Sequence, residues 1–174
     1  MDGREITTYL ENLSDALANR GVVGEIVLYG GAAMVLAHQA RLSTKDVDAV
    51  FLPKSTVYEA AAEVTRDHGA PDGWLNDAVK GFVSEKNDTL PLLDWPNLKV
   101  YVAAPEYLLA MKCLSMRLGR DDTDLGDIRF LMDRLGLRRP DDVLRLVESY
   151  YPGNRIQPKT RFAIEELCQH LPER

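Results

Sequence analysis

The stretch from residue 25 to residue 52 constrains the fold more than any other part of the sequence. A β-branched run, Glu25–Tyr29, leads into Gly30 and Gly31 and then into a helical pattern over 32–39. Residues 46–52 follow, and their polar half alternates with apolar residues as in a strand that has one buried face. A strand, a double-glycine turn, a helix and a second strand in close succession predict an α/β unit.

Further elements are expected on the C-terminal and N-terminal sides of this stretch. Apolar residues at helical spacing, a candidate cap at Ser55 and short β-branched runs are the local signals. The elements that they predict are helices over 5–20, 55–68 and 74–83 and strands over 90–93 and 98–103. The α/β half is therefore expected to contain three or four strands.

From Pro105 onward the sequence is wholly helical. Helices are expected to begin near Pro105, Asp121, Pro140 and Pro158, and proline is favoured at the first position of a helix. We therefore expect an α/β part over 1–104 and a helical part over 105–174. The two parts are expected to share one core, because no Ser/Gly-rich linker separates them.

The composition excludes several classes of protein. The chain has 174 residues, of which 45% are hydrophobic and 28% charged, as in an ordinary globular protein. No apolar run approaches the ~20 residues of a membrane span, and the charged N-terminus lacks the apolar core of a signal peptide. Cys113 and Cys168 lie far apart in the sequence, so buried thiols in a reduced, cytoplasmic protein are expected.

Basic residues gather in one segment of an acidic chain. The net charge is -6, yet residues 129–161 contain eight basic and four acidic residues. A general nucleic-acid coat is therefore excluded. The basic segment is either a local RNA-binding surface or a solvated helical face.

Two aspartates on the strand over 46–52 are the strongest candidates for chemistry. Asp46 and Asp48 are two residues apart, so on a strand both carboxylates project from the same face. Two such carboxylates repel each other unless a cation lies between them, and Mg2+ binds these oxygens together with water and nucleotide phosphates. The alternative is a surface strand whose aspartates pair with Lys45 or Arg41.

The two glycines before that strand indicate what the metal would act on. Gly30 and Gly31 let the backbone approach a bulky anion, and the helix that follows directs its N–H groups toward the same turn. A metal site beside an anion-binding turn indicates phosphoryl or nucleotidyl transfer.

The order of these residues resembles the signature of the DNA polymerase beta-type nucleotidyltransferase superfamily, in which a double glycine precedes an Asp-x-Asp strand. Glu106–Lys112 and Asp124–Ile128 resemble the last two motifs of its small bacterial AbiEii/MenT toxin-like branch. Trp74–Asp77 is similar to a segment of small nucleotidyltransferase-like bacterial proteins. The resemblance implies a minimal fold, with a mixed sheet flanked by helices and then a C-terminal helical bundle.

The resemblance also implies an activity and a set of residues. The activity is transfer of a nucleoside monophosphate from a nucleoside triphosphate to RNA, often transfer RNA, or to protein, with Mg2+ or Mn2+ as cofactor. In the toxin branch the partner is a cognate antitoxin protein. By position the implied site residues are Asp46 and Asp48 for the metal, Gly30 and Gly31 for the triphosphate, Lys112 for a phosphate and Asp127 as the acidic residue of the final motif.

The residues of the helical half have a second interpretation. Lys112 flanks the apolar stripe of its helix, so its stem would be packed and its ammonium would emerge at the edge. Asp124 and Asp127 are three residues apart on one helix face, where their repulsion needs a cation such as Lys112 or Arg120. These residues therefore form either part of a catalytic site or an ion pair that joins two antiparallel helices.

Two features depart from the superfamily pattern. Ala32 and Ala33 follow the double glycine where Ser or Thr is usual, so a hydroxyl contact to phosphate is missing. The strand over 98–103 has Lys99 and Tyr101 in place of a third carboxylate, and Asp94 is expected in a turn. The alternative function is therefore a catalytically degenerate binding module, an antitoxin or an adaptor.

Two further segments have roles that the sequence leaves open. Trp74 is either a packing anchor or, with Asn76, part of a base pocket. Ser43 and Thr44 either line the site or form a turn.

Overall fold

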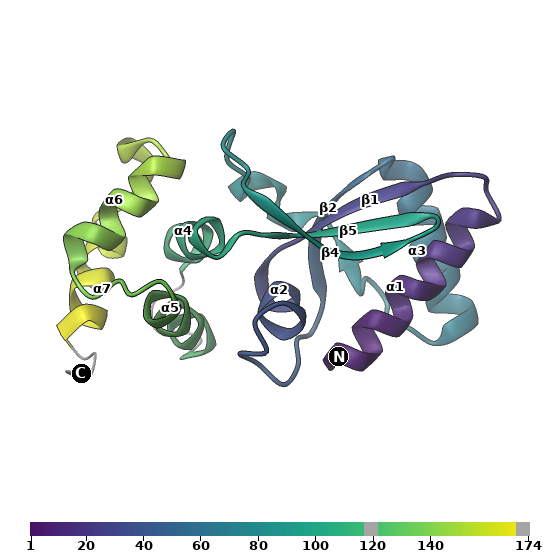
Figure 1. Cartoon of the computed structure of the whole chain (residues 1–174), viewed down its shortest axis with the longest axis horizontal. Coiled ribbons are helices and arrows are strands. Elements are labelled where there is room, and N and C mark those ends of the chain that lie inside the picture. Colours follow the sequence, from purple (N-terminus) through teal and green to yellow (C-terminus); the bar gives the residue numbers. More distant parts are fainter. Residues whose placement is uncertain (117–121, 170–174) are drawn as a thin grey trace. The chain divides into compact units, whose positions relative to one another are not determined.

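The computed structural model describes residues 1–116 and 122–169, which form a five-stranded mixed sheet and seven α-helices (Figure 1). The α/β class and the helical C-terminal part predicted from the sequence are confirmed. The chain divides into two compact units. The first unit comprises residues 1–81 and 89–103, and the second comprises residues 82–88 and those from 104 onward.

The first unit contains the whole sheet. Its helices are α1 (Gly3–Ala18), α2 (Gly30–Leu36) and α3 (Lys54–His68), and its strands are β1 (Gly24–Leu28), β2 (Val47–Leu52), β3 (Leu75–Asn76), β4 (Thr89–Trp95) and β5 (Leu98–Ala103). The strand order is β3-β2-β1-β5-β4. Strand β1 is antiparallel to β2 and parallel to β5, β3 is parallel to β2, and β4 is antiparallel to β5.

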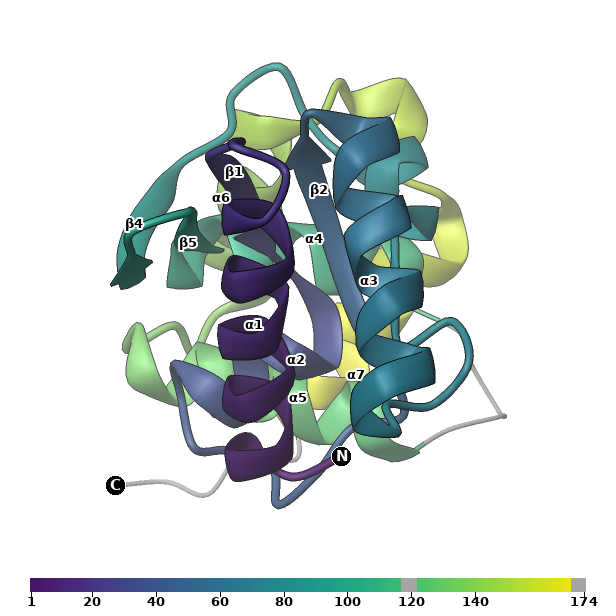
Figure 2. The same cartoon turned by 90° about the vertical axis from the view of Figure 1, so that its right-hand side faces the viewer.

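One face of the sheet is sealed by α1 and α3. The two helices pack against each other, and Figure 2 shows them side by side in front of the strands. Ile26, Leu28 and Val100 on this face are almost fully buried, whereas Val27 and Tyr101 on the other face are half-buried. The alternation predicted from the sequence therefore gives the sheet one core face and one more open face.

Local signals explain why the predicted helices form where they do. Helix α1 begins with a capping box, in which Asp2 accepts from the Glu5 N–H at 2.9 Å and Glu5 accepts from the Asp2 N–H at 2.8 Å. Helix α3 ends at Gly69, whose φ of 72° is left-handed. The cap expected at Ser55 is wrong, because α3 begins at Lys54 and its N-cap, Pro53, makes no side-chain hydrogen bond.

Some predictions about the first unit are wrong. The helix expected over 74–83 is a short strand, β3, followed by the 3-10 helix η1 (Ala78–Phe82), because the Trp74 carbonyl accepts from the Val47 N–H at 2.6 Å and draws the segment into the sheet. The turn expected at Asp94 is part of β4, where Asp94 lies opposite Lys99 of β5. The sheet also has five strands rather than the three or four expected. The sequence does not predict β3 because its two residues are too few to show periodicity.

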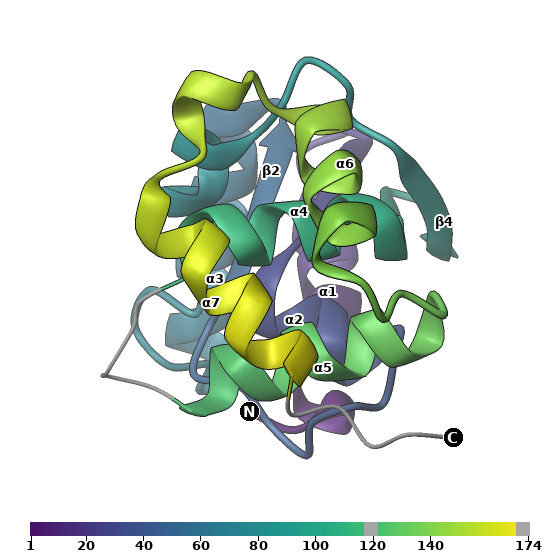
Figure 3. The same cartoon turned by 90° about the vertical axis from the view of Figure 1, so that its left-hand side faces the viewer.

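The second unit is built from four helices, seen in Figure 3, and a short 3-10 helix. They are α4 (Pro105–Ser115), α5 (Asp122–Arg134), α6 (Pro140–Tyr150), η2 (Gly153–Arg155) and α7 (Pro158–Gln169). Helix α4 packs against α5, α6 and α7, and all seven of its residues from 107 to 113 are buried. Proline lies at the first positions of α4 and α6, as the sequence predicts.

A loop between two elements of the first unit belongs to the second. Three tyrosine hydroxyls bind residues 82–88: Tyr107 accepts from the Ser84 N–H at 2.7 Å, Tyr150 donates to Asp88 at 2.7 Å and Tyr151 donates to the Phe82 carbonyl at 2.6 Å. The Tyr107 and Tyr150 rings stack with centroids 5.0 Å apart. Burial raises the pKa of both hydroxyls, so they remain protonated at neutral pH.

The two thiols should differ in reactivity. Cys113 is fully buried, and burial raises its pKa to about 12, whereas Cys168 is only partly buried. Because the thiolate is the reactive form, we expect a disulfide reagent such as DTNB at pH 8 to modify Cys168 first and Cys113 only on unfolding. Cys168→Ser should abolish the native reaction and Cys113→Ser should preserve it. Equal reaction of the wild-type chain and Cys168→Ser would contradict this prediction.

No helix within residues 1–116 and 122–169 is long and apolar enough to cross a bilayer.

Candidate functional site

The two glycines are the first residues of α2, and Gly30 lies against Asp48. Helix α2 begins at Gly30 rather than near Ala32 as predicted, and Gly30 has a left-handed φ of 53°. A Cβ at Gly30 would lie 2.8 Å from Oδ2 of Asp48. The close approach and the positive φ both require glycine, because any larger residue would displace the carboxylate.

Gly31 is enclosed by the loop that leads into β2. A Cβ at Gly31 would collide with the Thr44 hydroxyl, would lie 2.9 Å from the Thr44 Cβ, and would lie 3.4 Å from Nη1 of Arg41. The Thr44 hydroxyl also donates to the Asp46 carbonyl at 3.3 Å. Thr44 therefore both shapes the turn and brings a hydroxyl next to the double glycine. In the superfamily pattern a hydroxyl comes from the Ser or Thr that directly follows the double glycine. Here the hydroxyl comes from Thr44, in the loop before β2.

Asp46 lies immediately before β2, and its carboxylate is bound by Asn76. The Nδ2 of Asn76 donates to Oδ2 of Asp46 at 3.1 Å. Asn76 is the last residue of β3, and it lies opposite Asp48 in the parallel pairing of β3 with β2. The short edge strand therefore brings an amide beside the Asp-x-Asp pair, a contact that the sequence does not predict.

Asp77, the next residue, ties this edge strand to α3. The Lys54 ammonium lies 2.5 Å from its Oδ2, and the Tyr58 hydroxyl donates to its Oδ1 at 2.6 Å. Hydrogen bonds from Lys54 and then from Tyr58 hold the pKa of the Asp77 carboxyl well below its usual range. Asp77 is therefore ionised at neutral pH and fixes the end of β3.

Trp74 is a packing anchor and does not line a base pocket. Its side chain is 1% exposed, and its Nε1 donates to the Ala61 carbonyl at 3.3 Å. Its ring lies 5.6 Å from that of Tyr9 on α1. The base-pocket interpretation of Trp74 is therefore wrong, and of the pair only Asn76 reaches the candidate site.

The chemistry of these donors fits a hard divalent cation. Asp46 and Asp48 supply carboxylate oxygens, which are ligands that Mg2+ and Mn2+ prefer. Within residues 1–116 and 122–169, no group of three or more His, Cys, Asp or Glu side chains is arranged to hold a metal ion. A cation bound to the two aspartates would therefore complete its shell with water and substrate phosphates.

Lys112, Asp124 and Asp127 meet in the second unit. The Lys112 ammonium lies 2.8 Å from Oδ1 of Asp124 and 2.8 Å from Oδ2 of Asp127. The side chains of Lys112 and Asp127 are 9% and 3% exposed, and that of Asp124 is 26% exposed. The cluster joins α4 to α5, as in the ion-pair interpretation. Arg120, the other candidate cation, lies outside the described residues.

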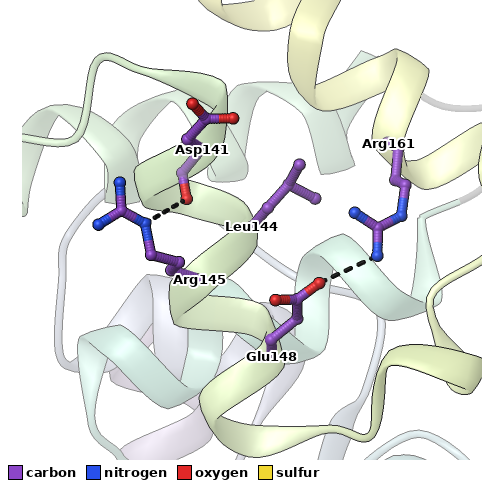
Figure 4. A pocket seen from close by; sticks show the side chains of 5 residues that line it. All are labelled: Asp141, Leu144, Arg145, Glu148 and Arg161. Atoms are coloured by element: carbon purple, nitrogen blue, oxygen red, sulfur yellow. Dashed lines mark hydrogen bonds and ion pairs between the residues drawn. The ribbon is translucent and has the colours of Figure 1, made fainter.

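The basic segment over 129–161 is partly neutralised by its own acidic residues. Each of its four acidic side chains lies within ion-pair distance of an arginine; the pairs are Arg138–Asp133, Arg139–Asp141, Arg145–Asp142 and Arg161–Glu148. An open groove between α6 and α7 is lined by Asp141, Leu144, Arg145, Glu148 and Arg161 (Figure 4). This mixture of charges favours a solvated face over a phosphate-binding surface.

Comparison with known proteins identifies the family. A family model described as "Nucleotidyltransferase of unknown function (DUF6036)" matches residues 5–139. The chain belongs to this nucleotidyltransferase family. The match supports the superfamily predicted from the sequence, whereas the AbiEii/MenT branch stays a prediction. Comparison with curated proteins and with solved structures finds no match. The residues that match the DUF6036 model include the double glycine, the Asp-x-Asp pair and the cluster at Lys112.

Proposed function

We propose that this DUF6036 protein is a metal-dependent nucleotidyltransferase that transfers a nucleoside monophosphate from a nucleoside triphosphate to a hydroxyl of RNA, including transfer RNA, or of protein. Asp46 and Asp48 bind Mg2+ or Mn2+, and Gly30 and Gly31 bind the triphosphate. We further propose that the protein acts in the cytoplasm as the toxin of a pair with a cognate antitoxin protein.

One observation carries the proposal. The Asp48 carboxylate lies so close to Gly30 that a Cβ there would be 2.8 Å from its oxygen. The carboxylate and the backbone of the turn are therefore adjacent, so a cation on Asp48 and a phosphate at the turn would be neighbours. Family membership supports a nucleotidyltransferase independently of this geometry.

The residues of the chain and the cofactor would have different roles in the reaction. The acceptor oxygen attacks the α-phosphorus, the bond from that phosphorus to the bridging oxygen breaks, and pyrophosphate leaves. A divalent cation, when bound, supplies charge neutralisation on the phosphates. Asp46 and Asp48 would hold that cation in place, and Gly30, which has no Cβ, leaves room for the Asp48 carboxylate beside the turn. The hydroxyl proton is released to water in this step.

Two residues of the second unit belong to the proposal through the resemblance. Lys112 would contact a phosphate, and Asp127 would be the acidic residue of the final motif. In the described structure Lys112 is bound to both Asp124 and Asp127. Contact with a phosphate would therefore require Lys112 to exchange its more exposed partner, Asp124.

The test is incorporation of label from α-32P nucleoside triphosphates into total RNA or into protein, with Mg2+ or Mn2+ present. We expect Asp46→Asn and Asp48→Asn to lower incorporation by about 100-fold or more, since charge stabilisation by a bound metal contributes several kcal/mol. Asp94→Asn is the matched control, because Asp94 is an exposed carboxylate on β4 of the same unit. It should leave incorporation unchanged.

The alternative function predicts a different outcome. A degenerate binding module, an antitoxin or adaptor, would incorporate no label with any of the four nucleotides and would bind them with no Mg2+ dependence. Isothermal titration with each nucleotide, with and without Mg2+, separates the two functions. A metal-dependent binding signal that Asp48→Asn removes would support the enzyme.

A further inference from the structure

We infer that Asn76 is a positioning residue for the metal site, and that it orients the Asp46 carboxylate by a hydrogen bond from its side-chain amide. The inference rests on the proposed function, because it assumes that Asp46 binds a divalent cation. The hydrogen bond itself, from Nδ2 of Asn76 to Oδ2 of Asp46, is 3.1 Å long.

The orientation of the amide is fixed by a second hydrogen bond. The Ala78 N–H donates to Oδ1 of Asn76 at 3.0 Å, which makes an Asx turn at the start of η1. Because Oδ1 accepts from the backbone, Nδ2 is the atom that faces Asp46. The amide therefore presents a donor, and not an acceptor, to the carboxylate.

The backbone of Asn76 is fixed on both sides. Asn76 lies opposite Asp48 in the pairing of β3 with β2, so the same residue is held against both aspartates. Asp77 follows, with its carboxylate bound by Lys54 and Tyr58 of α3. Trp74, two residues earlier, is buried in the core of the first unit. These contacts explain each polar residue of the Trp74–Asp77 segment.

A held carboxylate is a better metal ligand than a mobile one. A hydrogen bond to Oδ2 leaves the other oxygen of Asp46 to face a cation in one orientation, so less conformational freedom is lost on binding. Partners of this kind commonly contribute 10- to 100-fold to metal affinity. Since Asp46 lies before β2 and lacks the pairing with β3 that holds Asp48, it has the greater need of such a partner.

The hydrogen bond can be tested without metal. We expect one side-chain amide proton of Asn76 in the 15N-labelled protein to lie downfield and to move upfield in Asp46→Ala. Asp94→Ala is the control and should leave that proton in place. An Asn76 amide that does not respond to Asp46→Ala would overturn the inference, whatever the metal does.

The role toward the metal is tested by titration with Mn2+ alone, with free Mn2+ followed by electron paramagnetic resonance below the thermal transition of each variant. We expect Asn76→Ala to weaken Mn2+ binding by about 10- to 100-fold. Ala78→Pro removes the N–H that orients the amide and should weaken binding less. Asn154→Ala, an exposed asparagine of the second unit, should not change it.

The outcomes separate the two ideas. A residue with a merely structural role would lower the thermal transition of Asn76→Ala without changing the Mn2+ affinity of the folded protein, and that result would overturn the inference alone. Absence of Mn2+ binding by the wild-type chain would instead overturn the proposed metal site and, with it, this role of Asn76. If Asn76→Ala does not fold, Ala78→Pro decides the matter, and an unchanged affinity in that variant overturns the inference.

Discussion

Replacing Lys112 with methionine should lower the free energy of unfolding by about 3–5 kcal/mol, which is the range for removing one partner of a buried ion pair. Lys112 lies 2.8 Å from both Asp124 and Asp127, and its side chain is 9% exposed. Methionine keeps the packed stem but removes the ammonium. Two carboxylates on α5, one of them almost fully buried, would then have lost the ammonium that lies 2.8 Å from each of them.

Urea unfolding followed by circular dichroism at 222 nm measures this loss, because the second unit is helical. Lys99→Met is the matched control, since Lys99 is exposed on β5 and the same change there should alter stability by less than about 0.5 kcal/mol. A second variant, Lys112→Met with Asp127→Asn, should recover part of the loss because it also removes the charge of the more buried carboxylate. A loss no larger than that of Lys99→Met would show that the cluster does not stabilise the α4–α5 pair.

This experiment also bears on the two interpretations of Lys112. A residue that serves phosphate binding alone would change activity and leave stability intact. A residue that joins two helices would change stability in the absence of nucleotide. The distances to both aspartates favour a stabilising role in the nucleotide-free protein.

Sequence predicted the elements whose signals are local. Three helices begin at a proline, at Pro105, Pro140 and Pro158, and proline is favoured at the first position of a helix. The alternation over residues 46–52 marks β2 because every second side chain enters the core. In each case the residues that decide the structure lie within the element, so a single sequence is enough to predict it.

The sequence-based predictions are wrong where pairing with a distant segment of the chain determines the secondary structure. Strand β3 has two residues, too few for any periodicity, and it exists because Val47 binds the Trp74 carbonyl from far along the chain. Asp94 precedes Trp95 and Pro96 and has the local character of a turn residue. It is held in β4 by the antiparallel pairing that places it opposite Lys99.

The candidate site shows the same division. The residue types at Gly30, Gly31, Asp46 and Asp48 indicate a metal and a phosphate, and that much needs only the order of residues along the chain. The contact between Asn76 and Asp46 joins residues on different strands, and it depends on the register of β3 against β2. Sequence can therefore name the candidate ligands, whereas the contact proposed to orient one of them is seen only in the sheet.

Replacing Gly30 with alanine should weaken metal and nucleotide binding and should also destabilise the first unit. A left-handed φ of 53° costs a residue with a Cβ roughly 1–2 kcal/mol. The new Cβ would also lie 2.8 Å from Oδ2 of Asp48, so the carboxylate must move. A displaced ligand should weaken Mn2+ binding by about 10-fold or more.

Gly21 provides a control that separates these two effects. It lies in the same unit with a left-handed φ of 64°, and nothing lies within 4 Å of the position that its Cβ would take. Gly21→Ala should therefore show only the backbone cost, about 1–2 kcal/mol in urea unfolding followed by tryptophan fluorescence, with Mn2+ affinity unchanged. Gly30→Ala should lose more stability than Gly21→Ala and, unlike it, should bind Mn2+ more weakly. Both variants place a residue with a Cβ at a left-handed φ, so they differ mainly in the contact with Asp48. Equal Mn2+ affinities in the two variants would therefore mean that the position of the Asp48 carboxylate does not affect metal binding.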